Sequence, residues 1–579
     1  MRVVRRLLRR LRPARLWVVH HPDYAFSLSH VPLDPDRADR VLAFLREERL
    51  VPRQAVTRPR PASLEAILRV HTAEYLASLD RVEVVSQAMG TSLSDAERQD
   101  LLDHQRLGVG GTLRAARLAL RTRRPALNLS GGYHHATPGQ GMGFCLINDV
   151  AVAIAHLRRY GFAEPVLVVD LDLHDGNGTR AAFAADPTVH TFSIHNTDWE
   201  PAGGVASTAL ALGSGVDDER FHATLRETLP AVIAEHRPRF VFYVAGTDPA
   251  EDDRIGDWRL TAAGMLARDR FVVEEVSRQM GPVPVVVVLA GGYGREAWRY
   301  TARFAAWLAA NAIVEPPDDL ELILRRARRS QVRRAGGDDW GLTQDDLLGV
   351  GAAAPRVLGS MSRHAVELSL EEVGLLDAAR ARGFPAPSVA VDTGSGLGET
   401  VRLYGDAEHE APLMELRINR SKRVVPGMEV LYVEWLKLQN PRAEFSPTSA
   451  RLPGQDHPGL GLFREVVAWL VRLCETLGLD GLAAKPAQYY MAALSRRHVR
   501  FLDPVAQGRL DALCRTLGGL PLPRAEEALA GGRVIDDASG DPVRWETAVQ
   551  VFPVSDRLKR LVDEATRNRV PEFRFTLKD

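Results

Sequence analysis

The chain has 579 residues, too many for one ordinary hydrophobic core, with an apolar and charged content typical of globular proteins. Its formal net charge of zero argues against a general binder of nucleic acids or membrane surfaces, so we expect no specific nucleic-acid partner. Three widely spaced cysteines form neither a disulfide framework nor a Cys-x-x-Cys metal site, which favours a cytoplasmic location. No run of about 18 apolar residues predicts a membrane span.

Residues 1–15 are rich in arginine, and these arginines interrupt the apolar residues. The segment therefore lacks the apolar core of a signal peptide. We predict a solvated N-terminal extension; an arm that touches nucleic acid or lipid is the alternative.

From residue 16 to about residue 313, short apolar runs alternate with amphipathic stretches. Buried strands are predicted at residues 16–21, 125–132, 165–173, 189–195, 239–246 and 284–292. Helices are predicted at residues 37–50, 150–161, 218–236 and 262–281. This alternation predicts an α/β domain with a central parallel sheet that is covered on both faces. In such sheets, ligands bind beyond the carboxyl ends of the strands.

The stretch VLVVDLDLHDGNG begins as an apolar strand and then places Asp170, Asp172 and His174 at alternate positions. Alternate side chains of a strand share a face. Burying an unpaired carboxylate costs on the order of several kcal/mol, so these groups need a compensating cation. Two oxygen donors and one nitrogen suit a divalent metal. The alternative is a solvated acidic turn.

Three further clusters follow predicted strands. His134 and His135 can serve as a general base and its electrostatic partner, although alone they could be incidental turn residues. Asp248 can complete an Asp/His/Asp site with one coordination position left for water. Tyr293, in a glycine-rich turn, can donate its hydroxyl to a developing oxyanion.

Residues from about 16 to 308 resemble the zinc-dependent histone deacetylase and acetylpolyamine amidohydrolase superfamily. The resemblance rests on SGGYHHATPGQGMGFCLINDVAVA, VDLDLHDGNGT, FSIHN, AGTDPAEDDRIGDWRLT and AGGYG, in that order. Asn177 in DGNGT, the string AGTDPAEDDRIG, the three-residue GGY and the region HPDYAFSLSHVPLDPDRADRVLAFLREERLV are most similar to the class IV branch. The resemblance implies the arginase–deacetylase fold for residues 16–313.

The resemblance also implies a role for each matching residue. One Zn²⁺ per chain would be held by Asp172, His174 and Asp248. His135 would be the general base and His134 its electrostatic neighbour, with Asn177 and Asp170 behind them. Tyr293 would be the oxyanion donor. The wall of the acyl-lysine tunnel would include Gly143 and Phe144. A monovalent-cation site, for K⁺, would include Asp170, Asp172, His174 and Ser193.

The implied activity is removal of acyl groups from protein lysine side chains by metal-activated water. An acetylpolyamine or another small acylated amine is an alternative substrate. A non-catalytic acyl-lysine scaffold is an alternative of another class. Arginase-like two-metal chemistry is disfavoured, because the positions that would need extra carboxylates hold Gly176 and Ala250.

Residues 314–341 are rich in charge, carry Pro-Pro and Gly-Gly, and are predicted to form a linker with one helical segment. Residues 342–579 are predicted to form an α+β accessory domain. We expect strands at 399–406, 412–420, 428–439 and 479–485. We expect helices at 369–383, 461–478 and 486–497.

This order of elements resembles the GNAT acyltransferase fold, which implies an acetyl-CoA site after the third strand. Residues 455–461 occupy that position, and backbone N–H groups at a helix start can bind phosphate. The spacing of glycines departs from the usual GNAT motif, and Pro458 removes one donor. The alternative is a domain that presents substrate or mediates assembly. Tyr489 and Tyr490 are predicted to be core residues.

Overall fold

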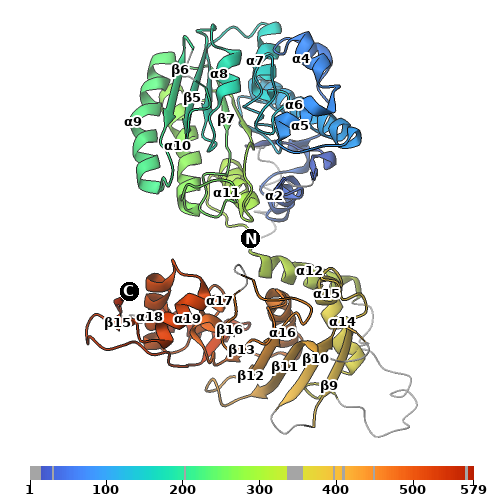
Figure 1. Ribbon diagram of the computed structural model, residues 1–579, viewed down its shortest axis with the longest axis vertical. Helices are drawn as coiled ribbons and strands as arrows, with labels where there is room; N and C mark the ends of the chain where they lie inside the picture. The colour runs from blue at the N-terminus through green and yellow to red at the C-terminus, as the bar shows by residue number, and fades with distance from the viewer. Residues whose placement is uncertain are drawn as a thin grey trace, which may run out of the picture. The chain divides into compact units, whose positions relative to one another are not determined.

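The computed structural model divides the chain into two compact units, Met1–Pro316 (unit 1) and Pro317–Asp579 (unit 2). Figure 1 shows both units, and each is described by itself. The described residues are 15–28, 31–200, 204–334, 356–394, 398–406, 411–446, 450–567 and 572–578. Residues 1–14 of the predicted extension and residues 335–341 of the predicted linker lie outside them.

An eight-stranded sheet forms the centre of unit 1, with the strand order β2-β1-β3-β8-β7-β4-β5-β6. Every neighbouring pair is parallel, which confirms the predicted parallel α/β sheet. The strands are β1 Trp17–Val19, β2 Val56–Thr57, β3 Ala126–Asn128, β4 Val166–Asp170, β5 Val189–His195, β6 Ser207–Ala211, β7 Phe240–Val244 and β8 Val285–Val288.

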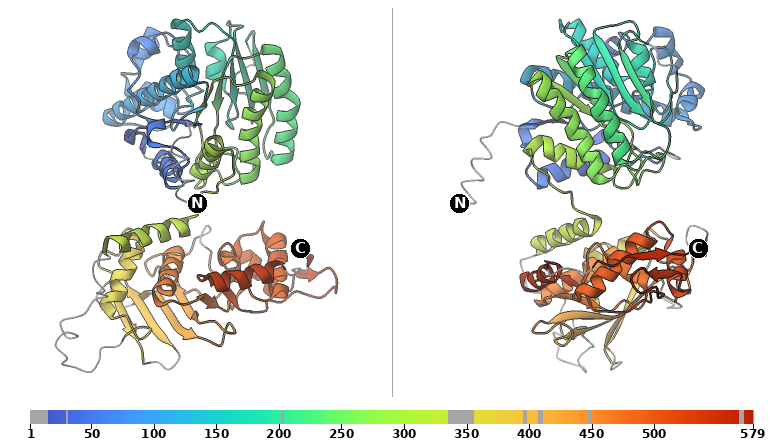
Figure 2. Two further views of the ribbon diagram at one scale, coloured as in Figure 1. Left: turned by 180° about the vertical axis from the view of Figure 1, so that it is seen from behind. Right: turned by 90° about the vertical axis from the view of Figure 1, so that its left-hand side faces the viewer.

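Helices cover both faces of this sheet, as Figures 1 and 2 show. The central strands are fully buried and almost entirely apolar, as expected when a parallel sheet lies between two helical layers. The helices are α2 Arg37–Glu47, α3 Leu64–Ile67, α4 Ala73–Ser78, α5 Val82–Met89, α6 Asp95–Thr122, α7 Asp149–Arg159, α8 Asn177–Ala182, α9 Asp218–His236, α10 Ala262–Met280 and α11 Ala297–Ala310. Two short 3₁₀ helices are η1 Pro22–Tyr24 and η2 Arg53–Ala55.

Local sequence explains where these elements begin and end. The long helix α6 begins at a capping box, in which Ser94 Oγ accepts from the N–H of Glu97 and the Glu97 carboxylate accepts from the N–H of Ser94. All six predicted strands of unit 1 are present. Strands β2 and β6 were not predicted, because both lie at the sheet edges and are only partly buried.

A seven-stranded sheet organises unit 2, with the strand order β14-β16-β13-β12-β11-β10-β9. Its neighbours pair antiparallel except β12 and β13, which are parallel. The strands are β9 Ser388–Asp392, β10 Glu399–Tyr404, β11 Pro412–Ser421, β12 Val430–Leu438, β13 Gly481–Ala484, β14 Arg500–Phe501 and β16 Gln550–Pro553. A separate two-stranded sheet pairs β15 Val534–Asp536 with β17 Phe575–Leu577.

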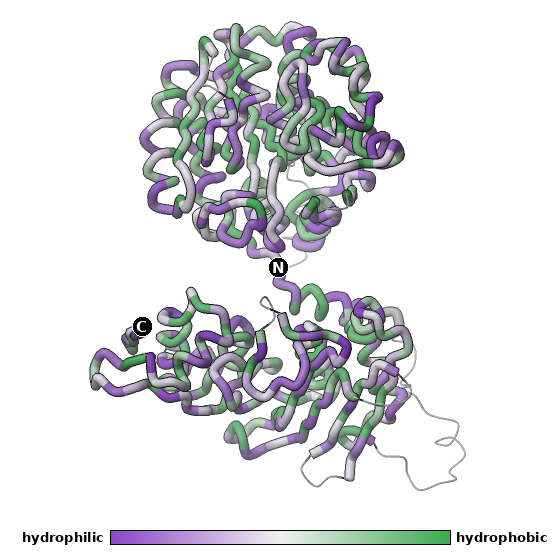
Figure 3. The backbone as a smooth tube through the Cα atoms, in the orientation of Figure 1, coloured by the Kyte–Doolittle hydropathy of each residue, from purple (hydrophilic) through white to green (hydrophobic). Residues whose placement is uncertain are grey.

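Helices of unit 2 pack on the sheet and on one another around apolar cores. Figure 3 shows that hydrophobic and hydrophilic residues alternate along these helices and strands. The helices are α12 Asp319–Arg334, α14 Arg363–Glu372, α15 Leu375–Arg380, α16 Phe463–Leu477, α17 Tyr489–Ser495, α18 Pro504–Leu517, α19 Leu522–Ala530 and α20 Asp556–Arg567. Among the described residues, each helix is too short or too polar to cross a bilayer.

The helical segment predicted within residues 314–341 is present as α12, and its side chains Leu320, Leu324 and Ala327 are buried in the core of unit 2. Two predictions for this region need correction. The single helix predicted at 369–383 is two helices, α14 and α15, because Gly374 adopts a left-handed backbone (φ 78°) between them. Tyr489 is buried as predicted, whereas Tyr490 is partly exposed.

Candidate active site

Strand order explains how distant segments of unit 1 come together. Strands β3, β8, β7, β4 and β5 are consecutive parallel neighbours, so their carboxyl ends lie along one edge of the sheet. The loops at this edge carry the predicted histidine pair, Tyr293, Asp248 and the Asp172–His174 pair. One detail differs from the prediction: β4 ends at Asp170, so Asp172 and His174 belong to the following loop and do not share a face through strand alternation.

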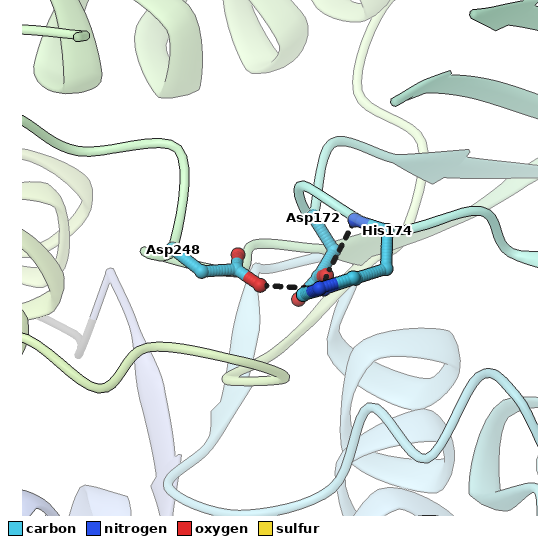
Figure 4. Close-up of side chains that lie close together, drawn as sticks. All are labelled: Asp172, His174 and Asp248. Atoms are coloured by element: carbon cyan, nitrogen blue, oxygen red, sulfur yellow. Dashed lines mark hydrogen bonds and ion pairs between the residues drawn. The ribbon is translucent and has the colours of Figure 1, made fainter. Parts of the chain in front are cut away.

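Three side chains from two loops meet at one point, as Figure 4 shows. His174 Nδ1 lies 3.1 Å from Asp172 Oδ1 and 3.0 Å from Asp248 Oδ2. Asp172 and Asp248 are 1% and 0% exposed. Glycines permit this close approach: a Cβ at Gly246 would lie 2.2 Å from Asp172 Oδ2, and one at Gly291 would lie 2.5 Å from Asp248 Oδ2. One ligand atom from each of the three residues lies within 4.8 Å of the others, so the set can hold a metal ion.

The charges of this cluster fit a cation. Burial lowers the pKa of His174, but hydrogen bonds to Asp172 and Asp248 outweigh it and raise the pKa to about 11. Burial and the charge of Asp172 also raise the pKa of Asp248 to about 7. The raised pKa of Asp248 reflects repulsion between two buried carboxylates, because the single charge of His174 balances only one of them. Metal ligands bind after losing their protons, and two carboxylates with one imidazole form a donor set that suits zinc.

A second group, Asp175, His195 and Asp198, also brings three ligand types together. Its buried member, Asp175, already has a cationic partner, because Arg180 donates to both Asp175 oxygens at 2.6 and 2.7 Å. The remaining carboxylate, Asp198, is exposed and pairs with His195. This group therefore lacks the charge excess of the first cluster.

The histidine pair lies beside the candidate metal cluster. The rings of His134 and His135 are 4.1 Å apart, and His134 Nε2 is 3.7 Å from Asp172 Oδ1. As the resemblance implied, Asp170 Oδ2 lies 2.7 Å from His134 Nδ1 and Asn177 Oδ1 lies 2.9 Å from His135 Nδ1. Each histidine thus presents Nε2 to its surroundings.

The two backing residues give these histidines different protonation behaviour. Burial lowers the pKa of His134, but the charges of Asp170 and Asp172 outweigh it and raise the pKa to about 9. Burial and the charge of His134 hold the pKa of His135 well below its usual value, which the neutral Asn177 only partly opposes. His134 is therefore a cation near neutral pH, whereas His135 is a free base.

A cavity of about 180 Å³ joins these groups. Its lining includes His134, His135, Gly143, Phe144, Asp172, His174, Trp199 and Tyr293. Gly143 adopts a positive φ of 54°, and a Cβ there would lie 2.4 Å from His135 Cδ2, so only glycine fits beside the imidazole. The rings of Phe144 and Tyr293 are 6.2 Å apart.

The residues predicted for a monovalent cation are also adjacent. Ser193 of β5 pairs in register with Asp170 of β4, next to Asp172 and His174. The Ser193 hydroxyl already lies 2.8 Å from His195 Nδ1. An ion at this position stays a prediction.

Four residues around the cavity were not singled out from the sequence. Trp199 stacks on His135 with ring centres 4.0 Å apart, and Arg37 donates to the carbonyls of Ala290 and Gly291 beside Tyr293. Asp149 accepts from two N–H groups of the turn before the histidine pair, and Asp253 accepts from the N–H of Tyr293. Asp253 lies inside the motif AGTDPAEDDRIG, but nothing in its neighbours along the chain indicates a contact 40 residues away.

Unit 1 is similar in sequence to deacetylases. The Histone deacetylase domain family matches residues 31–308. A probable deacetylase of Archaeoglobus fulgidus is 31% identical over 338 residues, covering 54% of this chain and 92% of that protein. Histone deacetylase 2 of Arabidopsis thaliana is 28% identical over 319 residues, covering 52% of this chain and 81% of that protein.

Among solved structures, the crystal structure of an HDAC homologue from Aquifex aeolicus aligns with a TM-score of 0.44 and 24% identity, covering 51% of this chain and 84% of that chain. The probable deacetylase aligns over 92% of its own length at 31% identity, and the family match covers the same unit. Through unit 1, the chain belongs to the histone deacetylase domain family.

Proposed function

We propose that the chain is a zinc-dependent amidohydrolase that removes acyl groups from lysine side chains of proteins. The observation that carries this proposal is the convergence of the Asp172–His174–Asp248 cluster, the His134–His135 pair and Tyr293 around one cavity. The match to a probable deacetylase supports it.

Asp172, His174 and Asp248 would hold the ion, with two carboxylate oxygens and one imidazole nitrogen. When bound, zinc supplies a Lewis acid that polarises an acyl carbonyl and lowers the pKa of a water to about 7. A single ion fits better than two. A Cβ at Gly176 would already lie 2.6 Å from Asp170 Oδ2, so a carboxylate for a second metal has no room there.

The chain's own residues manage the protons. His135 keeps a proton on Nδ1 for Asn177, so its Nε2 is free to take a proton from the attacking water. His134 is held as a cation by Asp170 and can donate from Nε2 to the leaving amine. The Tyr293 hydroxyl, which has no hydrogen-bond partner among the described residues, can donate to the acyl oxygen as negative charge develops there.

An activity panel tests the proposal. Purified protein is assayed on an acetyl-lysine peptide, a long-acyl-lysine peptide and an acetylpolyamine, with and without chelator. Turnover of peptide that stops with chelator, and that Tyr293→Phe and His135→Ala each lower by about 10²-fold or more, is the expected result. Turnover of acetylpolyamine alone would replace the protein substrate with a small acylated amine. Ligand binding without any turnover would favour a non-catalytic scaffold.

Finer assignments extend this proposal. We place unit 1 near the class IV branch. Asn177, one of the four sequence features behind that resemblance, lies behind His135. We also propose K⁺ beside Asp170 and Ser193, and a cytoplasmic location. We propose a catalytic domain at residues 16–313 and an accessory domain at residues 342–579; the burial of α12 in the unit 2 core suggests that the second domain begins earlier.

For unit 2 we propose a GNAT-like arrangement. Its order of antiparallel strands, followed by a parallel step from β12 to β13 through α16, supports this assignment. Acetyl-CoA is the ligand to test, by isothermal titration into the full chain. Absence of binding heat would leave unit 2 as an accessory domain without that cofactor.

A further inference from the structure

The loop after β7 carries two functionally placed aspartates. Asp248 belongs to the candidate metal cluster, and Asp253 follows five residues later. Asp253 Oδ2 accepts from the backbone N–H groups of Tyr293 at 2.6 Å and Gly294 at 3.0 Å. Its other oxygen accepts from two N–H groups of its own loop, both at 2.9 Å. One carboxylate therefore ties the Asp248 loop to the tyrosine loop through four backbone groups.

These bonds form a strong restraint, because hydrogen bonds to an ionised carboxylate are roughly twice as strong as bonds between neutral groups. The preceding residue, Asp252, binds groups later in the chain than Tyr293: it accepts from the N–H of Glu296 at 3.0 Å and from the Tyr300 hydroxyl at 2.6 Å. Asp253 is thus the carboxylate that contacts the backbone of Tyr293 itself.

The chain before Tyr293 is held independently. Arg37 donates to the carbonyls of Ala290 and Gly291, and the Thr247 N–H donates to Gly291 at 2.9 Å. Gly292 has a φ of 140°, and a Cβ there would lie 2.0 Å from Thr247 Oγ1. Because these contacts end at residue 292, the hydrogen bonds from Asp253 complete the restraint on the other side of Tyr293.

The tyrosine side chain depends on this backbone support. Tyr293 is 9% exposed and lines the cavity with Asp172 and His174, while its hydroxyl has no hydrogen-bond partner among the described residues. The hydroxyl is therefore placed by the backbone and by packing. A misplacement of about 1 Å in a reacting group can cost about 10²-fold in rate.

We propose that Asp253 is a positioning residue that holds the Tyr293 hydroxyl where it can donate to the acyl oxygen. The inference rests on the proposed hydrolase function, because it assigns Asp253 no contact with substrate or metal. Asparagine is the informative replacement. Its Nδ2 would face backbone donors, so one pair of bonds is lost at nearly unchanged volume.

A double-mutant cycle tests this mechanism. We expect Asp253→Asn to lower kcat by about 10- to 100-fold, with KM little changed, since the hydroxyl acts mainly in the transition state. In a Tyr293→Phe background the same substitution should cost almost nothing more. Equal losses in both backgrounds would show that Asp253 acts on some other feature and would overturn the proposal.

Hydrogen exchange supplies a readout that does not depend on activity. Peptides that cover residues 290–296 should exchange faster in Asp253→Asn, with zinc content per chain unchanged. Asp257→Asn is the matched control: Asp257 lies in the same segment, is exposed, and has no hydrogen bond among the described residues. Unchanged exchange in Asp253→Asn, or an equal change in Asp257→Asn, would contradict the proposal.

Two outcomes separate this inference from the proposed function. If Tyr293→Phe keeps full turnover, the role of the tyrosine in the proposed function fails, while the exchange experiment still reports whether Asp253 holds the loop. If Tyr293→Phe loses turnover and Asp253→Asn does not, the positioning inference alone fails. Should Asp253→Asn not fold, Asp253→Glu, which keeps the charge one methylene away, takes its place in the same cycle with a smaller expected loss.

Discussion

The two units arrange polar side chains around their sheets in different ways. In unit 1, parallel neighbours β3, β8, β7, β4 and β5 direct their loops to one edge, where buried acids and histidines meet. In unit 2, β9 to β12 alternate in direction, so successive loops leave at opposite edges. Among the described residues of unit 2, no three histidine, cysteine or acidic side chains come together as a metal cluster.

Charged residues on the unit 2 sheet pair instead at the surface. Arg402 binds Glu415 and Arg420 binds Glu429, each at 2.8 Å and partly exposed. Such pairs contribute only about 0–1 kcal/mol each. The parallel strands of unit 1 therefore bring polar side chains together at one edge, whereas the antiparallel strands of unit 2 distribute them over both edges. The exception in unit 2 is the parallel pair β12–β13. The carboxyl ends of these two strands are followed along the chain by α16 and α17. If unit 2 binds a ligand, we expect the ligand at this edge of the sheet.

The largest expected effect comes from removing a proposed metal ligand of unit 1. Asp248→Asn should reduce zinc content from roughly one ion per chain to near none and abolish turnover, because two remaining ligands do not form a catalytic site. Metal analysis after dialysis measures it. Asp198→Asn, in the second acidic group, is the control and should keep its zinc. Loss of zinc in the control would indicate that the ion binds the Asp175–His195–Asp198 group instead.

Removing only the Tyr293 hydroxyl, the proposed oxyanion donor, should have a smaller effect. Tyr293→Phe is expected to lower kcat by about 10²–10³-fold, the usual cost of one such donor, while zinc content stays the same. Steady-state kinetics with the acetyl-lysine peptide measures it. Tyr300→Phe removes a hydroxyl from the same segment away from the cavity and should change kcat little. Comparable losses in both variants would point to general loosening of the segment.

A core substitution in unit 2 tests whether the stability of unit 2 affects catalysis in unit 1. Leu403 of β10 is fully buried, so Leu403→Ala should destabilise unit 2 by about 2–5 kcal/mol. Hydrogen exchange should rise in peptides around residues 399–421 and remain unchanged around residues 166–174. Deacylase kcat should also remain unchanged. A parallel fall in kcat would show that catalysis depends on unit 2.

Much of the architecture of unit 1 could be predicted, because its central strands are continuous apolar runs with few alternatives. The edge strand β6 could not, since half-buried STALA carries little hydrophobic signal. The break at Gly374 was missed because helical periodicity continues across it.

The sequence motifs of the candidate site predicted which residues would carry the chemistry, but not the loop contacts around them. Asp172, His174 and Asp248 do meet, although 74 residues separate the last two, because β4 and β7 are neighbours. The stacking of Trp199 on His135 and the bonds from Asp253 to Tyr293 depend on how loops fold over the sheet edge. Loop packing of this kind leaves no periodic pattern in a single sequence.

The smallest expected effect concerns a buried histidine of unit 1 outside the cavity. His71 is 1% exposed, and its Nε2 accepts from the N–H of Asn148, the residue that caps α7. Burial lowers the pKa of His71 from 6.5 to about 4, with carbonyls of Thr137 and Pro138 opposing it in part. The folded state therefore holds this imidazole neutral.

The direction of the pH effect follows from the difference between the pKa of His71 in the unfolded chain, 6.5, and in the folded protein, about 4. The stabilising contribution is complete above pH 6.5, the unfolded pKa, and is lost as the pH falls toward about 4. At about pH 5 the expected loss is on the order of 2 kcal/mol. Urea unfolding of unit 1 at several pH values measures it, and His71→Gln, which keeps an acceptor that does not titrate, should flatten the dependence. If the wild type and His71→Gln lose stability equally on acidification, other groups carry the effect and His71 does not mark a buried neutral site.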